Sequence, residues 1–239
     1  MKIITYNVNG IRSAINKNWL AWLQATNADV VCLQEIKATP DVLTDLGLVD
    51  AMGYQHYWFP AEKKGYSGTA IFTKILPKHV EYGCGIPDFD REGRNIRVDF
   101  DDVSVMSVYF PSGSSGDERQ IFKYRFMDEF GKYLTLLKVE YPKLVICGDA
   151  NSSGFLPEER EWMENFIESG YIDTFRHLNK EPHNYTWWSF RANSRAKNLG
   201  WRIDYAIATK ELEENIKRAA ILPEAKHSDH CPVLLELEF

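Results

Sequence analysis

The chain has 239 residues, and its 28 Lys and Arg against 34 Asp and Glu leave a formal net charge of −6. This charge argues against a protein that holds a polyanion by bulk charge, but it leaves room for one that gathers its cations on a single face. Hydrophobic residues make up 44% and charged residues 26% of the chain, which excludes a disordered or low-complexity protein and suits a sizeable core.

The first half of the chain predicts mainly strands, because β-branched and apolar residues recur there in short runs. In chain order we expect a strand over 3–6, a helix over 19–28, a strand over 30–33, a short helix over 42–47, and strands over 69–73, 94–100 and 103–109. Asp101 and Asp102 separate the last two strands and predict a hairpin turn, so part of the sheet is antiparallel.

The second half adds longer helices. One apolar stripe at helical spacing consists of Phe122, Phe126, Phe130, Leu134 and Leu137. A strand over 144–147 precedes a helix that begins at Pro157 and buries Trp162, Met163, Phe166 and Ile167. A strand over 203–208, a short helix over 211–218 and a strand over 233–237 complete the series. The loop over 112–116 is too short to separate domains, so we predict one α/β domain over residues 1–239.

The cysteines and the N-terminal sequence predict the compartment. The four cysteines include no CxxC pair, and Cys32 and Cys147 lie within apolar runs, so we expect free thiols in the core rather than a zinc site. No apolar run approaches the roughly 18 residues that cross a bilayer, and no export signal is evident. We therefore expect a cytoplasmic protein without membrane attachment.

Polar side chains recur where apolar strands end, and these positions are Asn7, Asn9, Glu35, Lys37, Tyr109, Asp149 and Asn151. Asp204 lies inside an apolar run, where burying an acid is costly unless it is paired. His230, just before the last strand, is a natural partner because a carboxylate fixes the tautomer of a histidine and can raise its pKa. Any one of these acids could instead cap a helix, but together they favour a site.

The residue types at these positions predict the chemistry. They offer hard oxygen ligands and no cysteine, which favours Mg²⁺ or Mn²⁺ over zinc. Magnesium held by one or two carboxylates usually takes its other ligands from water and substrate phosphate. From the residues alone we therefore predict a metal-dependent phosphoesterase.

The stretch Tyr185–Tyr205 combines cations with aromatic rings. It contains Arg191, Arg195, Lys197 and Arg202 interleaved with Trp187, Trp188, Phe190 and Trp201, and no acid occurs from Thr186 to Ile203. Such a stretch can be an aromatic core with a solvated basic face, or a surface for phosphates and unstacked bases. Lys63 and Lys64 could add a backbone contact or be ordinary surface charge.

Nine segments in order closely resemble the exonuclease III class of abasic-site endonucleases within the endonuclease/exonuclease/phosphatase superfamily. They are Asn7–Arg12, Leu33–Lys37, Gly65–Gly68, Glu92–Arg94, Tyr109–Pro111, Cys147–Asp149, Gly154–Arg160, Lys197–Tyr205 and Ser228–Pro232. The resemblance implies a four-layer α/β sandwich like that of DNase I, in which helices flank two packed mixed β-sheets and the site lies at one edge.

The resemblance also implies roles for individual residues. Metal binding falls to Glu35, Asn7 and Asp229, and catalysis to Asp149, His230, Tyr109, Asp204 and Asn151. Asp149 would orient or deprotonate the attacking water, and His230 would polarise the phosphate. Contacts with DNA and the abasic pocket fall to Trp188, Trp201, Arg191, Arg195, Lys197, Asn193, Tyr66 and Lys37. An abasic sugar has no base to unstack and is comparatively easy to flip out.

Two positions depart from the pattern. Ser112 stands where many relatives have Asn. The segment between Asp149 and Gly154 is shorter than in relatives, so either the loop is truly short or part of a longer loop is missing. In the second case Asn151 would not be the phosphate-binding asparagine.

The function implied is an Mg²⁺-dependent DNA phosphodiesterase of base excision repair that cuts duplex DNA 5′ to abasic sites. A 3′→5′ exonuclease or 3′-end-cleaning activity would act on blocked 3′ ends. The alternatives are a phosphoesterase for phospholipids or inositol phosphates, and a catalytically inactive DNA-binding module. We expect a monomer whose DNA binding rests on few, localised phosphate contacts and therefore depends only shallowly on salt.

Overall fold

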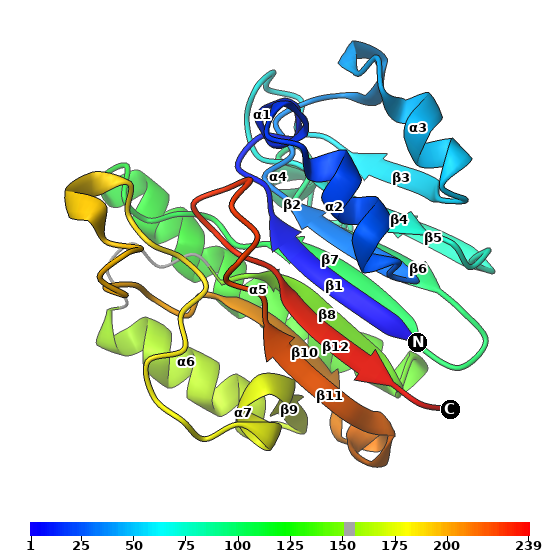
Figure 1. Ribbon diagram of the computed structural model, residues 1–239. Coiled ribbons are helices and arrows are strands. Elements are labelled where there is room, and N and C mark those ends of the chain that lie inside the picture. The colour runs from blue at the N-terminus through cyan, green and yellow to red at the C-terminus, as the bar shows by residue number, and fades with distance from the viewer. Residues whose placement is uncertain (151–155) are drawn as a thin grey trace.

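The computed structural model describes residues 1–150 and 156–239, and in this part of the chain two six-stranded sheets pack against each other with helices on their outer faces (Figure 1). The predicted four-layer α/β sandwich is therefore confirmed. The first sheet has the order β11 (Ile216–Ile221), β12 (Val233–Leu237), β1 (Lys2–Asn7), β2 (Val30–Gln34), β4 (Thr69–Thr73) and β3 (Gln55–Phe59). The second has the order β5 (His79–Tyr82), β6 (Asn95–Asp99), β7 (Ser104–Tyr109), β8 (Leu144–Asp149), β10 (Asp204–Thr209) and β9 (Tyr171–Asp173).

The two sheets repeat one pattern around a parallel pair of strands. In the first sheet β1 and β2 are parallel, with β12 and β4 antiparallel on either side. In the second sheet β7 and β8 are parallel, with β6 and β10 antiparallel on either side. Strands β2 and β8 hold equivalent places, and each runs directly into an acidic position, Glu35 or Asp149.

Alternation along the strands divides the apolar residues among three clusters. Ile3, Val30, Cys32, Val145 and Cys147 lie in the cluster that the two sheets share. The neighbouring residues on these strands face outward, toward the helices. All four cysteines are free thiols, as predicted.

Helices cover the outer faces of both sheets (Figure 1). The first sheet is covered by α1 (Ile11–Asn16), α2 (Trp19–Thr26) and α3 (Leu46–Ala51). The second is covered by α4 (Pro87–Asp90), α5 (Asp117–Glu140) and α6 (Pro157–Glu168). Helix α7 (Thr174–Leu178) contacts β9 and β10 of the second sheet and also β11 of the first. The described residues also form three 3₁₀ turns, which are η1 (Pro40–Val42), η2 (Arg191–Asn193) and η3 (Lys210–Asn215). Among the described residues no helix is both long and apolar enough to span a membrane.

The predicted elements are mostly confirmed. Each of the eight predicted strands is present to within two residues at either end, and the helix over 19–28 and the helix that begins at Pro157 are found. The stripe on α5 buries four of its five predicted members, with Phe122 partly exposed. On α6 only Phe166 of the predicted face is fully buried, and the other three pack partly against the same cluster.

Two predicted helices and several omitted strands need correction. The helix over 42–47 is wrong, because η1 ends at Val42 and α3 begins only at Leu46. The helix over 211–218 is also wrong: η3 ends at Asn215 and the chain then pairs with β12 as β11. Strands β3, β5, β9 and β11 were not predicted.

Candidate active site

Three loops meet at one edge of the sandwich, and backbone hydrogen bonds join them. The Gly10 N–H donates to the carbonyl of Glu35 at 2.7 Å, and the Lys37 N–H donates to the carbonyl of Ser67 at 2.9 Å. Glu35 and Lys37 both have positive φ, 56° and 52°. Left-handed backbone at non-glycine residues is costly and clusters at functional sites, where the surrounding structure enforces it.

Asn7 joins the acids at the ends of the two equivalent strands. Its side-chain amide donates to Glu35 Oε2 at 3.1 Å and to Asp149 Oδ2 at 2.8 Å. Its carbonyl oxygen accepts the backbone N–H of Asn9 at 2.9 Å. Because Asn7 is completely buried, its orientation is fixed, and one amide holds carboxylates from both sheets together.

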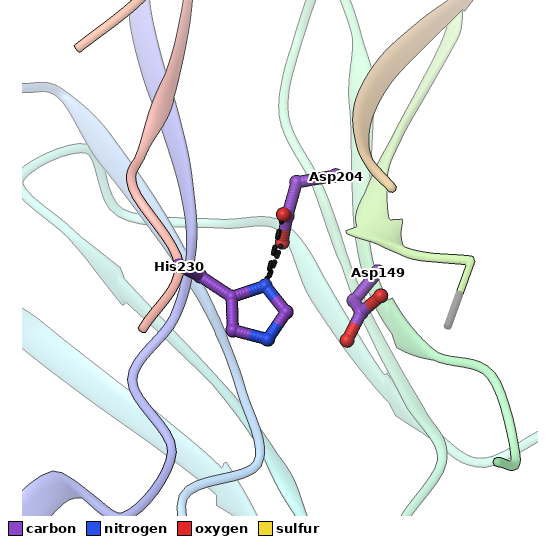
Figure 2. Close-up of side chains that lie close together, drawn as sticks. All are labelled: Asp149, Asp204 and His230. Atoms are coloured by element: carbon purple, nitrogen blue, oxygen red, sulfur yellow. Dashed lines mark hydrogen bonds and ion pairs between the residues drawn. The ribbon is translucent and has the colours of Figure 1, made fainter. Parts of the chain in front are cut away.

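Asp149, Asp204 and His230 form a buried group at this edge (Figure 2). The pairing of β8 with β10 places Asp204 directly opposite Asp149. His230 Nδ1 lies 2.9 Å from Asp204 Oδ2 and 3.2 Å from Oδ1. The potential ligand atoms of the three residues all lie within 4.8 Å of one another, which is consistent with a metal site.

The acids and the histidine shift each other's protonation. Burial raises the pKa of Asp149 to about 8, with the charge of His230 opposing this effect and that of Asp204 adding to it. Burial acts to lower the pKa of His230, but the charge and hydrogen bond of Asp204 outweigh it and raise that pKa to about 10. His230 is therefore an imidazolium at neutral pH, and its second ring nitrogen carries a proton that can be donated to a phosphate oxygen.

The site also meets a test for a metal ion. Asp149 Oδ1 is buried and has no hydrogen-bond partner among the described residues, so it is an acceptor oxygen that those residues leave unsatisfied. Glu35 is less buried, and its Oε1 lies 2.8 Å from the ammonium of Lys37. Oxygen atoms of this kind suit a hard divalent cation.

Asp229, a predicted metal ligand, is engaged with neighbouring side chains. Its Oδ1 accepts from Asn9 Nδ2 at 3.0 Å, and its Oδ2 accepts from Trp187 Nε1 at 2.9 Å. Burial would raise the pKa of Asp229, but His230 and these donors lower it. The structure therefore shows Asp229 as a link between two loops of the site.

Trp187, rather than Trp188, faces His230 of the buried group. Its ring centroid lies 6.5 Å from that of His230, and its backbone forms bridges with Trp201 and His230. Trp188 is only 4% exposed, and its Nε1 donates to Asn198. Adjacent residues of an extended segment point to opposite sides, and this period of two could have identified Trp187 from the sequence. Trp201 is 47% exposed, at the edge of the site.

The other predicted DNA contacts divide into exposed and engaged side chains. Arg191, Asn193 and Lys197 are exposed on the loop between Trp188 and Trp201. Lys37 pairs with Glu35. Arg195 donates to three backbone carbonyls. The predicted phosphate-binding Asn151 lies outside the described residues.

Tyr66 and Tyr109 share a network that was not predicted. The buried guanidinium of Arg94 donates to Tyr66 Oη at 2.9 Å, and it lies 4.8 Å from the centroid of the Tyr109 ring. Arg119 at the start of α5 donates to the same Tyr66 oxygen, also at 2.9 Å, and Glu92 accepts from both arginines. The motif Glu92–Arg94 thus positions two tyrosines beside the site.

A groove borders the site on the side of Lys37. It has a volume of about 590 Å³, and its lining includes Arg12, Lys37, Lys63, Lys64 and Tyr66. Glu62 and Asp41 also line it, so the groove is cationic but not exclusively so. Basic residues in a groove of this kind suit the phosphates of an extended polyanion.

Comparison with known proteins places these features in a family. The model of the endonuclease/exonuclease/phosphatase family matches residues 4–230. An exodeoxyribonuclease from Bacillus subtilis (strain 168) is 40% identical over 253 residues, which cover 98% of each chain. A DNA-(apurinic or apyrimidinic site) endonuclease from Dictyostelium discoideum is 35% identical over 98% of this chain and 69% of its own.

Solved structures agree with these matches. A 3′ phosphatase from Neisseria bound to a product DNA hairpin superposes with a TM-score of 0.88 at 26% identity, covering both chains completely. An AP endonuclease from Archaeoglobus fulgidus also gives a TM-score of 0.88, at 25% identity and with full coverage of both chains. The resemblance carried by the nine sequence segments is thereby confirmed.

Proposed function

We propose that this chain, which belongs to the endonuclease/exonuclease/phosphatase family, cuts duplex DNA 5′ to abasic sites with Mg²⁺ as cofactor. Within that family it is a DNA repair nuclease of the exodeoxyribonuclease and AP endonuclease type. Cleavage leaves a 3′-hydroxyl, and trimming of blocked 3′ ends accompanies it. The observation that supports this most is the junction at Asn7, which joins Glu35 to Asp149 beside the pair of His230 and Asp204.

We place the metal on the carboxylate side of this junction. Glu35 would hold it, next to the amide of Asn7 and the unsatisfied Oδ1 of Asp149. His230 is a poor ligand, because its Nδ1 is bound to Asp204 and a metal-binding histidine must be neutral. An all-oxygen set favours Mg²⁺, with Mn²⁺ as a substitute. When bound, the ion offsets the negative charge of the phosphate during cleavage.

The protein side chains orient the attacking water and bind the phosphate. Asp149 Oδ1 has a lone pair available to accept a hydrogen bond from the attacking water and so to orient it. His230 donates from its second ring nitrogen to a phosphate oxygen, and Asp204 keeps it charged and correctly oriented. Tyr109, held against Arg94, acts on the phosphate or the leaving oxygen. Stabilising charge where it develops is the main contribution of such a site.

Two basic surfaces border the site and suit a nucleic-acid backbone. One is the groove lined by Arg12, Lys37, Lys63 and Lys64. The other is the loop that carries the exposed Arg191 and Lys197. Trp187 lies beside His230 and pairs through its backbone with Trp201, and on this second surface the two flat rings would receive an extruded sugar. This arrangement favours DNA over a phospholipid or an inositol phosphate.

The test is incubation with a duplex oligonucleotide that carries one abasic analogue, in Mg²⁺ and in EDTA. We expect a single nick 5′ to the analogue in Mg²⁺ and none in EDTA. Asp149→Asn should reduce the rate about 10²- to 10⁴-fold while DNA binding survives. Asp128→Asn, at an exposed acid on α5, is the matched control. Phosphate release from inositol phosphates without nicking of the duplex would contradict the proposal.

A further inference from the structure

Arg195 lies in the basic loop but points its donors into the protein. Its Nη1 donates to the carbonyl of Ser228 at 3.1 Å. Its Nη2 donates to the carbonyls of Pro223 at 2.8 Å and Ala225 at 2.7 Å. The guanidinium also lies 4.7 Å from the centroid of the Trp188 ring. Three of its five N–H donors are therefore committed to backbone oxygens of one distant segment.

The other cations of this loop behave differently. Arg191 and Lys197 are exposed, whereas Arg195 is only partly exposed and Trp188 beneath it is buried. A guanidinium that serves three carbonyls would have to break those bonds to reach a phosphate. Position in the basic stretch alone thus groups together residues that have different environments.

The segment that Arg195 holds leads directly to the catalytic histidine. Ser228, whose carbonyl Arg195 binds, is buried, and its hydroxyl accepts the backbone N–H of His230 at 3.2 Å. The same hydroxyl donates to Asp229 Oδ1 at 3.1 Å. On the loop side, the Trp188 N–H donates to the carbonyl of Asp229 at 3.2 Å. Arg195 therefore closes a connection between the loop from Trp187 to Trp201, which we call the aromatic loop, and the segment before β12 that carries His230.

We propose that Arg195 is a positioning residue for His230: it fixes residues 223–230 against the aromatic loop and does not bind a DNA phosphate. This rests on the proposed nuclease function, in which His230 contacts the scissile phosphate. Small displacements of a catalytic group reduce the rate of the chemical step strongly. Arg195 should therefore affect kcat, whereas the exposed cations should affect DNA affinity.

The experiment compares Arg195→Ala and Arg195→Lys with Arg191→Ala and Lys197→Ala on the abasic duplex. For Arg195→Ala we expect kcat to fall about tenfold to hundredfold, while KM and the salt dependence of binding stay as in the wild type. For each exposed cation we expect a higher KM and a log–log salt slope shallower by about one. Arg195→Lys should restore part of kcat, because an ammonium can still donate to these carbonyls.

A higher KM and a shallower salt slope for Arg195→Ala, with kcat unchanged, would overturn the proposal, and so would a variant that matches the wild type in every measurement. If Arg195→Ala is unfolded at the assay temperature, Arg195→Lys carries the same comparison. Absence of nicking by the wild type would instead contradict the nuclease function. In that case the ¹H–¹⁵N signal of the His230 ring still tests whether Arg195 positions His230. This signal should shift in Arg195→Ala and stay unchanged in Lys197→Ala.

Discussion

Replacing Asp204 by Asn tests most directly whether Asp204 acts by keeping His230 charged. Asp204 is 1% exposed and His230 4% exposed, so neither charge is screened by water. Asparagine has the same shape, and its carbonyl oxygen can still accept the Nδ1–H of His230. The substitution therefore removes the negative charge and leaves the packing nearly unchanged.

The expected magnitude follows from that burial. A hydrogen bond to a charged partner contributes about 1.5–3 kcal/mol and a neutral one about 0.5–1.5 kcal/mol, so the bond alone loses roughly 1 kcal/mol. A buried cation that loses its partner is disfavoured by about 3–5 kcal/mol. If the transition state needs the imidazolium, the barrier rises by about this amount. At about 1.36 kcal/mol per factor of ten, turnover should fall about 10²- to 10⁴-fold.

The assay is single-turnover cleavage of the abasic duplex across a Mg²⁺ titration, with DNA affinity measured in parallel. We expect a lower maximal rate, an unchanged Mg²⁺ midpoint and unchanged affinity. Asp99→Asn is the matched control. Asp99 is also a buried aspartate and pairs with Arg97 at 2.8 Å, but it lies at the opposite end of the same sheet, opposite Ser104. The Asp99→Asn variant should be less stable than the wild type, but its folded form should cleave at the wild-type rate.

One outcome would refute this reasoning. Asp204 also belongs to the group whose atoms lie within 4.8 Å and could hold a metal. If Asp204 were a metal ligand, Asp204→Asn would shift the Mg²⁺ midpoint upward, and a high Mg²⁺ concentration would restore the wild-type rate. Full restoration of the rate by Mg²⁺ would therefore show that Asp204 binds the metal and does not act through His230.

Three further predictions concern stability and the aromatic loop. Burial would raise the pKa of Glu92, but the hydrogen bonds and charges of Arg119 and Arg94 outweigh this effect and lower the pKa from its usual value of 4.5. The ionised Glu92 therefore adds to the free energy of unfolding above that pH, and this contribution is lost as the pH falls through the lowered pKa of the folded protein. Glu92→Gln should flatten this acid dependence in urea unfolding, and an unchanged pH profile would contradict it. Glu159→Ala removes the buried partner of Lys123, 2.9 Å away, and should lower the free energy of unfolding by about 3–5 kcal/mol; a loss below 1 kcal/mol would count against the pair. Trp188→Ala should lower stability by about 3–5 kcal/mol in the same assay, whereas Trp187→Ala should mainly lower kcat/KM for the abasic duplex, and the reverse pattern would show that the two rings were assigned wrongly.

The strands that the sequence did not reveal are the edge strands of the two sheets. Strands β3 and β11 are the edges of the first sheet, and β5 and β9 are those of the second. The central strands β2, β4, β7 and β8 are buried at every residue and therefore read as continuous apolar runs. An edge strand such as β5 is mostly exposed, and its sequence resembles that of a loop. Pairing with a distant neighbour makes these segments strands, and local composition does not record that pairing.

The same distinction applies to the site. Residues at strand ends were identified because an abrupt change from apolar to polar marks them, and Asn7, Glu35 and Asp149 do meet in space. The direction in which a side chain points could not be predicted from the sequence in the same way. Arg195 and Arg191 have the same charge and lie four positions apart, but only the folded loop shows that one donates to backbone carbonyls and the other is exposed.

The distribution of charge reconciles an acidic protein with an anionic substrate. The acids of the site are compensated locally, since Asp204 pairs with the His230 imidazolium and Glu35 with Lys37. These charges largely cancel within the protein and exert little field at a distance. Arg191 and Lys197 remain exposed, and we therefore expect cations of this kind to hold the DNA. The net charge of −6 then has little influence on substrate binding, and a shallow salt slope should reflect the small number of such cations.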